Sequence, residues 1–282
     1  MLKLLETMKV DLELKGYSLN TVEAYLRYSK QFLDYYQKPI EQLHTDEIRN
    51  YLHYLIVIKK CSHSYVNVNH SALKFLYKNT LNQQWNIDKI PRMKKEKKLP
   101  VILSKAEVRN IFKVAKNLKH KAILTTVYSA GLRISEVRNL TITDIDSKNM
   151  QIRVRQAKGK KDRYTLLSQN NLSLLRNYWK EYRPDYWLFP GVPSTKAISA
   201  RTIQGFFKNY LNKTKITKKA TVHTLRHCFA THLLEAGIDI FHIQKLLGHA
   251  SPKTTARYIH LTHKDIIDVK SPFDMIDSDY DD

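Results

Sequence analysis

Cysteine, glycine and proline are all scarce in this sequence, and long apolar runs are missing. The 282 residues include two cysteines, seven glycines and eight prolines. Cys61 and Cys228 form no CxxC pair, which argues against a disulfide scaffold or a cysteine-based zinc site and fits a reducing compartment. The longest strongly apolar run, residues 55–58, is far too short to span a bilayer, and the first residues lack a signal-peptide core. We therefore expect a globular, cytoplasmic protein.

Acidic residues are also in short supply. There are 26 Asp and Glu against 48 Lys and Arg, which gives a net charge of +22. The last eleven residues hold five aspartates and no Lys or Arg, so the rest of the chain is more basic still. Such a surplus suits a polyanionic partner, because each neutralised phosphate releases condensed counterions. A basic protein with solvated lysines and a protein that binds anionic membranes are the alternatives, although no basic amphipathic helix stands out.

The first 90 residues predict a small helical domain. A helix can begin at Ser18 or Asn20, and apolar and aromatic residues then recur close to the helical period. A second helix can begin at Thr45 and a third near Ser64. No repeat of fixed period is visible.

A basic segment, residues 91–100, follows this domain. Two prolines bracket one acid and five basic residues, which are Arg92, Lys94, Lys95, Lys97 and Lys98. The composition predicts a linker, which could lie along a phosphate backbone or be a solvated hinge. We therefore divide the chain into a domain over 1–90, a linker over 91–100, a second domain over 101–271 and an acidic tail over 272–282.

The second domain combines helices with a hairpin. It opens with a capping box at Ser104. Residues 151–156 alternate as a half-buried strand, 158–162 form a turn and 163–167 return as a second strand. Helices dominate again in the C-terminal third. The predicted fold class is mainly α, with a small antiparallel β-sheet in this α+β domain.

Two arginines border apolar elements of the second domain. One face of the helix expected over residues 222–235 is apolar and should be buried, with His223 and Arg226 to one side of it. Arg133 follows a glycine turn after an apolar helix. A partly buried guanidinium stays charged and needs an anion, which for a lone arginine could be an internal carboxylate. Two arginines with a histidine instead suit one phosphodiester.

The histidines and one tyrosine complete this set. His223 and His227 are four residues apart but lack the glutamate of the zincin pattern, and Arg226 between them would repel a cation, so we expect no metal. His249 alone could be a helix-cap residue. Tyr258 is one of 17 tyrosines, and most tyrosines on helices are core or boundary residues. It stands out because the short helix after His249 should bring the two together.

The ordered set of residues resembles the tyrosine recombinase (phage integrase) family. That family has an arginine in a GLR-type turn, a hairpin lysine, an HxxR motif, a later histidine or tryptophan, and a tyrosine. Here these positions are held by Arg133, Lys158, His223, Arg226, His249 and Tyr258. Glu136 matches an acidic residue that follows the first arginine, and we give it a supporting role. The resemblance covers nearly the whole chain and implies a SAM-like core-binding domain before the catalytic domain. Val222, where relatives often carry proline, and the acidic tail depart from the pattern.

The resemblance implies a site-specific DNA recombinase that needs no metal, ATP or other cofactor. Tyr258 would attack the scissile phosphate, which gives a 3′-phosphotyrosyl bond and later a Holliday junction. His223 would accept or orient the phenolic proton, and Lys158 would protonate the departing 5′-oxygen. The two arginines and His249 would bind the transition state.

The resemblance also implies the partners. These are a duplex DNA recombination site and a homotetramer on two such sites, with residues 263–271 docked on a neighbouring protomer. We expect DNA contacts from the linker and hairpin residues Arg92, Lys94, Lys95, Lys97, Lys98, Lys160, Lys161 and Arg163. A type IB topoisomerase and a non-catalytic DNA-binding protein of the same fold are alternatives. The short chain and the intact set of residues favour a compact recombinase of transposon, phage or Xer type.

Overall fold

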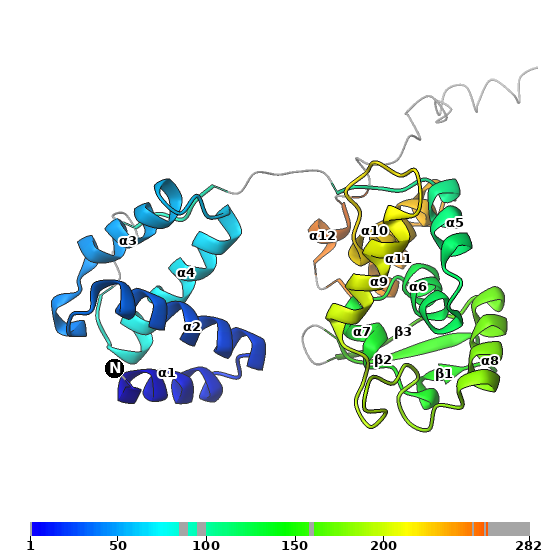
Figure 1. Ribbon diagram of the computed structural model, residues 1–282, viewed down its shortest axis with the longest axis horizontal. Coiled ribbons are helices and arrows are strands. Elements are labelled where there is room, and N and C mark those ends of the chain that lie inside the picture. Colours follow the sequence, from blue (N-terminus) through cyan, green and yellow to red (C-terminus); the bar gives the residue numbers. More distant parts are fainter. Residues whose placement is uncertain are drawn as a thin grey trace, which may run out of the picture. The chain divides into compact units, whose positions relative to one another are not determined.

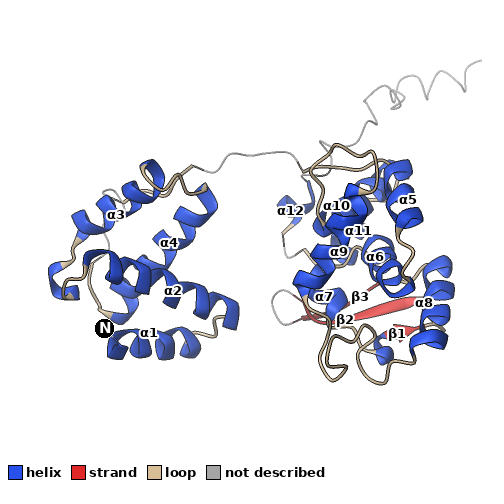
Figure 2. Cartoon of the chain, in the orientation of Figure 1, coloured by secondary structure: helices blue, strands red, loops and turns tan. Residues whose placement is uncertain are grey.

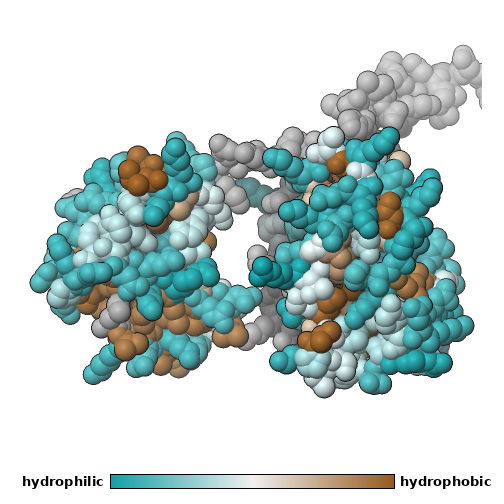
Figure 3. Space-filling model, in the orientation of Figure 1, coloured by the Kyte–Doolittle hydropathy of each residue, from teal (hydrophilic) through white to brown (hydrophobic). Residues whose placement is uncertain are grey.

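The computed structural model describes residues 2–84, 90–94, 100–157, 161–249, 251–256 and 258. The chain divides into two compact units, Met1–Lys98 and Leu99–Asp282, each taken by itself below (Figure 1). Over the described ranges, no helix is both long and apolar enough to cross a membrane. The visible face of each unit is mainly hydrophilic (Figure 3).

The first unit is entirely helical over its described residues. It contains α1 Leu2–Leu14, α2 Leu19–Tyr36, α3 Thr45–Val57 and α4 His63–Phe75, with a 3-10 turn at Ile40–Gln42 and a π turn at Leu76–Thr80. Ser18 is the N-cap of α2, because its side chain accepts a hydrogen bond from the Thr21 amide; Asn20 lies within the helix. Helix α4 begins one residue before the expected position and is capped by Ser62. Helix α1 was not expected from the sequence.

The first residues of the expected linker are attached to this unit. Asn67 Nδ2 donates to the Met93 carbonyl at 3.1 Å, and the buried His70 ring bonds the Ile90 carbonyl through Nε2 at 2.9 Å. Both side chains come from α4. The backbone at Ile90 and Met93 is therefore hydrogen-bonded to α4 of the N-terminal unit.

The second unit surrounds a small sheet with helices (Figure 2). The order of its helices and strands is α5 Lys105–Val114, α6 Leu118–Ala130, α7 Ile134–Arg138, β1 Ile145–Asp146, β2 Gln151–Ala157, β3 Lys161–Leu166, α8 Gln169–Tyr182, α9 Ala200–Asn212, α10 Val222–Glu235, α11 Ile240–Leu247 and α12 Pro252–Ala256. The sheet is antiparallel with the order β1-β2-β3, and Ile152 pairs with Thr165. This confirms the predicted fold class, while β1 and α8 were not expected.

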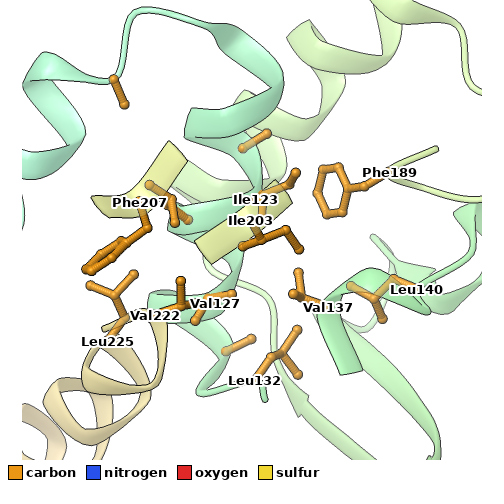
Figure 4. Close-up of a cluster of buried hydrophobic side chains, with 14 of the residues drawn as sticks. Ile123, Val127, Leu132, Val137, Leu140, Phe189, Ile203, Phe207, Val222 and Leu225 are labelled. Carbon is orange, nitrogen blue, oxygen red and sulfur yellow. The ribbon is translucent and has the colours of Figure 1, made fainter. Parts of the chain in front are cut away.

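The core of the second unit forms around α6. Figure 4 shows Ile123 and Val127 of this helix among apolar side chains from α7, α9 and α10, and all of them are buried. Helix α10 contributes Val222 and Leu225 to this cluster. Arg226 follows them on the same helix, so the packing that buries the apolar face of α10 also fixes where this arginine lies.

Gly131 allows α6 and α10 to approach closely. It ends α6 in the left-handed conformation, with φ of 62°. A Cβ added there would lie 2.4 Å from Cδ1 of Phe229 on α10. Only glycine meets both conditions, since it has no Cβ and adopts positive φ without strain. The turn to Arg133 therefore depends on this residue.

Candidate active site

Glu136 is the centre of the candidate site. Its carboxylate accepts hydrogen bonds from Arg133 Nη1 at 2.6 Å and from the Arg133 amide at 2.8 Å. Arg163 on β3 binds both carboxylate oxygens, each at 2.8 Å. This bidentate geometry is the one in which an arginine–carboxylate pair is strongest. The Glu136 side chain is only 6% exposed, so the sheet and the turn after α6 are joined through a buried ion pair.

Arg226 completes the cluster from α10. Its Nη1 donates to the Gly131 carbonyl and its Nη2 to the Leu247 carbonyl, both at 2.6 Å, and Nη1 lies 3.5 Å from Glu136 Oε2. The side chain is 1% exposed. Arg226 thereby holds the ends of α6 and α11 against α10. The structure brings Arg226 together with Arg133 and Glu136, although Arg226 lies 90 positions after Glu136 in the sequence.

The charges of this cluster do not balance. Burial by itself would raise the pKa of Glu136, but the hydrogen bond and charge of Arg163 and the Arg133 amide lower it to about 2. Burial lowers the pKa of Arg226 to about 9, and the charge of Arg133 lowers it further while Glu136 opposes the change. Three guanidinium groups thus share one carboxylate. An anion close to the guanidinium groups would relieve their repulsion. Of the three arginines, Arg133 lines an open cavity of about 590 Å³.

His249 is placed by the end of α11. Gly248 ends that helix with φ of 62°, and a Cβ there would lie 2.7 Å from Cδ of Arg163. The His249 ring is oriented by Thr255 of α12, whose Oγ1 lies 2.8 Å from Nδ1. A hydrogen bond to one ring nitrogen of a histidine fixes the orientation of the ring and the role of the second nitrogen. Because Nδ1 of His249 bonds to Thr255, Nε2 is directed away from α12.

Tyr258 lies over the same region. Its ring is buried with Phe229, Ile243 and Leu247, and it runs nearly parallel to the His249 ring at a centroid distance of 6.4 Å. Its hydroxyl lies 2.9 Å from Nδ1 of His227 on α10. The structure therefore brings Tyr258 next to His249, as expected, and also next to a histidine that the sequence reasoning considered only as a metal ligand.

His223 lies one helical turn before His227. Its side chain is exposed and borders a second cavity, and the two imidazole rings are 4.5 Å apart at an interplanar angle of 75°. The signal that could have identified His227 is its position directly after Arg226 in the sequence. Over the described ranges, no group of three His, Cys, Asp or Glu side chains could hold a metal.

Several predicted site residues cannot be placed. Lys158, the proposed general acid, lies outside the described residues, as do the four predicted DNA contacts Lys95, Lys97, Lys98 and Lys160. The side chain of Lys161 is likewise not described. Lys94 is exposed, and Arg92 is exposed with its Nη2 donating to Ser71 Oγ at 2.8 Å.

From its position in the predicted hairpin, Arg163 was expected to contact DNA. The structure instead directs its side chain into the cluster around Glu136. Its side chain is 9% exposed, binds Glu136 through both terminal nitrogens, and donates from Nε to the Leu246 carbonyl at 2.9 Å. Each of its three guanidinium nitrogens thus donates to an acceptor of the protein. Its position instead supports a structural role, in which it connects β3 to Glu136 and to the end of α11.

The sequence matches two family models in chain order. Residues 4–87 match the phage integrase N-terminal SAM-like domain, and residues 101–265 match the phage integrase family. A putative integrase/recombinase of Sinorhizobium fredii is 41% identical over 98% of this chain and 90% of its own length. Tyrosine recombinase XerA of Pyrococcus horikoshii is 36% identical over 93% of this chain and 90% of its own length.

Solved structures have the same fold. A crystal structure of XerA recombinase is 30% identical, covers 93% of this chain and 94% of its own, and has a TM-score of 0.55. A lambda integrase dimer bound to a core site has a TM-score of 0.73 with 19% identity, and covers 92% and 94% of the two chains. At this lower identity the likeness concerns the fold alone.

Proposed function

Because this chain belongs to the phage integrase family of tyrosine recombinases, we propose that it recombines DNA by cutting and rejoining duplex strands through a covalent bond to Tyr258. The observation that carries the proposal is the convergence of Arg133, Arg226, His249 and Tyr258 at a cluster in which one carboxylate offsets only one of three guanidinium charges. A scissile phosphodiester is an anion of the right charge for this place. A phenol directly beside it is a suitable nucleophile.

The cleavage step transfers the phosphoryl group to the enzyme. The Tyr258 hydroxyl oxygen bonds to phosphorus while the bond from phosphorus to the 5′-oxygen breaks, which leaves a 3′-phosphotyrosyl ester. Lys158 gives the departing 5′-oxygen its proton. The ester conserves the free energy of the phosphodiester, so the 5′-hydroxyl of a partner strand can displace Tyr258 without ATP. The first such exchange produces a Holliday junction.

The arginines act on the transition state. As five oxygens gather around phosphorus, negative charge increases on the nonbridging oxygens. Arg133, Arg226 and His249 offer donors whose orientation is already fixed by Glu136, two backbone carbonyls and Thr255, respectively. Preorganised donors stabilise developing charge more than mobile ones, because nothing has to reorient during the reaction.

Duplex DNA is the proposed partner. The net charge of +22 supports a polyanion, and the lambda integrase of the same fold is bound to a core site. We propose contacts from the linker lysines and from Lys160 and Lys161, and a homotetramer on two sites held together through residues 263–271. Arg163 is left out of the DNA-binding set because of its contacts with Glu136.

Covalent trapping tests the nucleophile. On a nicked substrate from which the cleaved fragment diffuses away, the wild-type protein should accumulate a protein–DNA adduct. Tyr258→Phe should still bind the substrate and form no adduct, because the ring is retained and only the hydroxyl is removed. Tyr182→Phe, at an exposed tyrosine of the same unit, is the control and should form adduct at the wild-type rate. Adduct formation by Tyr258→Phe would refute the assignment.

A further inference from the structure

His227 is the imidazole that contacts the nucleophile of the proposed reaction. Its Nδ1 lies 2.9 Å from the Tyr258 hydroxyl oxygen, and the two ring centroids are 5.7 Å apart. A phenol attacks phosphorus poorly unless its proton is accepted, because its pKa is about 10 in water. Whichever group receives this proton must be within hydrogen-bond distance of the hydroxyl. His227 meets that condition before any DNA is bound.

The fold holds His227 rigidly. It follows Arg226, whose guanidinium is anchored to the carbonyls of Gly131 and Leu247. On its other side is Cys228, which is fully buried and accepts a hydrogen bond from the Leu103 amide. With both neighbours fixed, the direction in which the His227 side chain leaves α10 is set by the packed core. Such a group does not need to reorganise in order to act.

Tyr258 is held against this histidine from the opposite side. Its ring packs with Phe229 of α10 and Leu247 of α11, and the His249 ring lies parallel to it. Thr255, three residues earlier, is fully buried, and its carbonyl accepts a hydrogen bond of 2.9 Å from the Tyr258 amide. The hydroxyl is thus directed at His227 by contacts along the whole ring.

The other polar groups near the hydroxyl suit different tasks. Arg226 is close enough to Tyr258 for an electrostatic interaction, but a guanidinium is already protonated and cannot take the proton. His249 is oriented by Thr255 through Nδ1, as expected for a phosphate donor. His223 contacts the edge of the His227 ring and is exposed, so it can support that ring from outside.

We propose that His227 accepts the phenolic proton of Tyr258 as the phosphotyrosyl bond forms. This deepens the proposed function and rests on it. His227 is neutral before the step, with its proton on Nε2 and the Nδ1 lone pair facing the hydroxyl. The proton moves from oxygen to Nδ1 as oxygen bonds to phosphorus, which leaves an imidazolium. In rejoining, the imidazolium returns the proton to the departing phenolate. His223 then has an orienting role.

A more acidic nucleophile tests this assignment. 3,5-Difluorotyrosine, incorporated at position 258 alone, has a phenol that loses its proton more readily and needs less help from a base. His227→Asn keeps a polar amide near the position of Nδ1 but cannot accept a proton. With tyrosine at 258 we expect this variant to cleave about 100-fold more slowly than wild type, the lower end of the usual general-base contribution. With difluorotyrosine the loss should be less than about tenfold.

Matched variants separate the possible outcomes. His223→Asn should be slowed about equally with either nucleophile, since an orienting residue is not replaced by a more acidic phenol. His242→Asn, at an exposed histidine of α11, should have no effect. DNA binding and the thermal transition of each variant are measured alongside cleavage. An equal loss for His227→Asn with both nucleophiles, or recovery of His223→Asn alone, would overturn the proposal. Failure of the wild type to form adduct would instead refute the proposed function.

Discussion

At the scale of single residues, Glu136 links three arginines of the candidate site. One buried carboxylate accepts from Arg133, Arg163 and Arg226, and each arginine comes from a different part of the chain. Because the carboxylate offsets only one of the three positive charges, it orients the guanidinium groups without cancelling their attraction for a phosphate. Glu136 thus sets the geometry of the site, and the surplus charge remains for the ligand.

Glu136→Gln should destabilise the second unit in a pH-dependent way. The pKa of Glu136 is lowered from 4.5 to about 2 in the folded protein. A lowered carboxyl pKa contributes stability that is fully present above pH 4.5 and is lost as the pH falls towards 2. From the size of this shift we expect a loss of about 3 kcal/mol at pH 7, measured by urea unfolding followed by tryptophan fluorescence. The difference from wild type should shrink steadily between pH 4.5 and pH 2.

A surface ion pair of the same sheet is the control for this experiment. Asp162 pairs with Arg153 at 2.7 Å, and both side chains are well exposed. Water screens such a pair, so Asp162→Asn should change the free energy of unfolding by less than about 1 kcal/mol. A Glu136→Gln effect of the same size at pH 3 as at pH 7 would show that the carboxylate charge is not what stabilises the cluster.

At the scale of helices and strands, the contact between α6 and α10 decides where the arginines lie. Gly131 ends α6 beside Phe229, Arg133 follows in the turn, and Arg226 donates back to the Gly131 carbonyl. Thr165 of β3 adds a bond to the carbonyl of Ala130 at 2.8 Å, which ties the sheet to the same helix end. One turn thereby positions groups from two helices and a strand.

Gly131→Ala should weaken this junction. The left-handed conformation costs a non-glycine residue about 1–2 kcal/mol, and the contact with Phe229 adds overpacking strain of about 1–3 kcal/mol. We expect a loss of roughly 2–5 kcal/mol in the urea experiment, together with slower cleavage. Gly205→Ala within α9 is the matched control, since its Cβ would meet nothing within 4 Å. That variant should gain about 0.5–1 kcal/mol from helix propensity, so equal effects at both glycines would contradict the interpretation.

At the scale of the whole molecule, two units with separate cores carry one strongly basic charge. If the linker lies along the phosphate backbone, Lys94→Ala should remove one phosphate contact. The negative slope of log affinity against log salt should then become shallower by about 0.9. Lys9→Ala is the control, since the exposed Lys9 on α1 already lies 3.9 Å from Glu13. Binding to a duplex site at several salt concentrations gives both slopes. An unchanged slope for Lys94→Ala would place this lysine away from DNA.

Much of the fold could be predicted from the sequence because its signals are local. Capping residues such as Ser18 and Ser104 bond to amides three residues away, and the alternation over 151–156 requires only a neighbouring strand. The missed helix α1 also had a local signal, since the buried Met8 and Leu12 are four residues apart. The strand β1 had none, because its two residues depend entirely on pairing with β2.

The sequence by itself determined the kind of chemistry, since the order and types of its polar residues identify the family and point to Tyr258. Only the tertiary structure decided which groups meet. It took Arg163 from the expected DNA surface to Glu136, and it placed His227 beside the Tyr258 hydroxyl. The physical reason is that these contacts join residues 27 and 31 positions apart. No local period reports such separations, because the packing of α10 against α6 and α11, and of α11 against β3, fixes them.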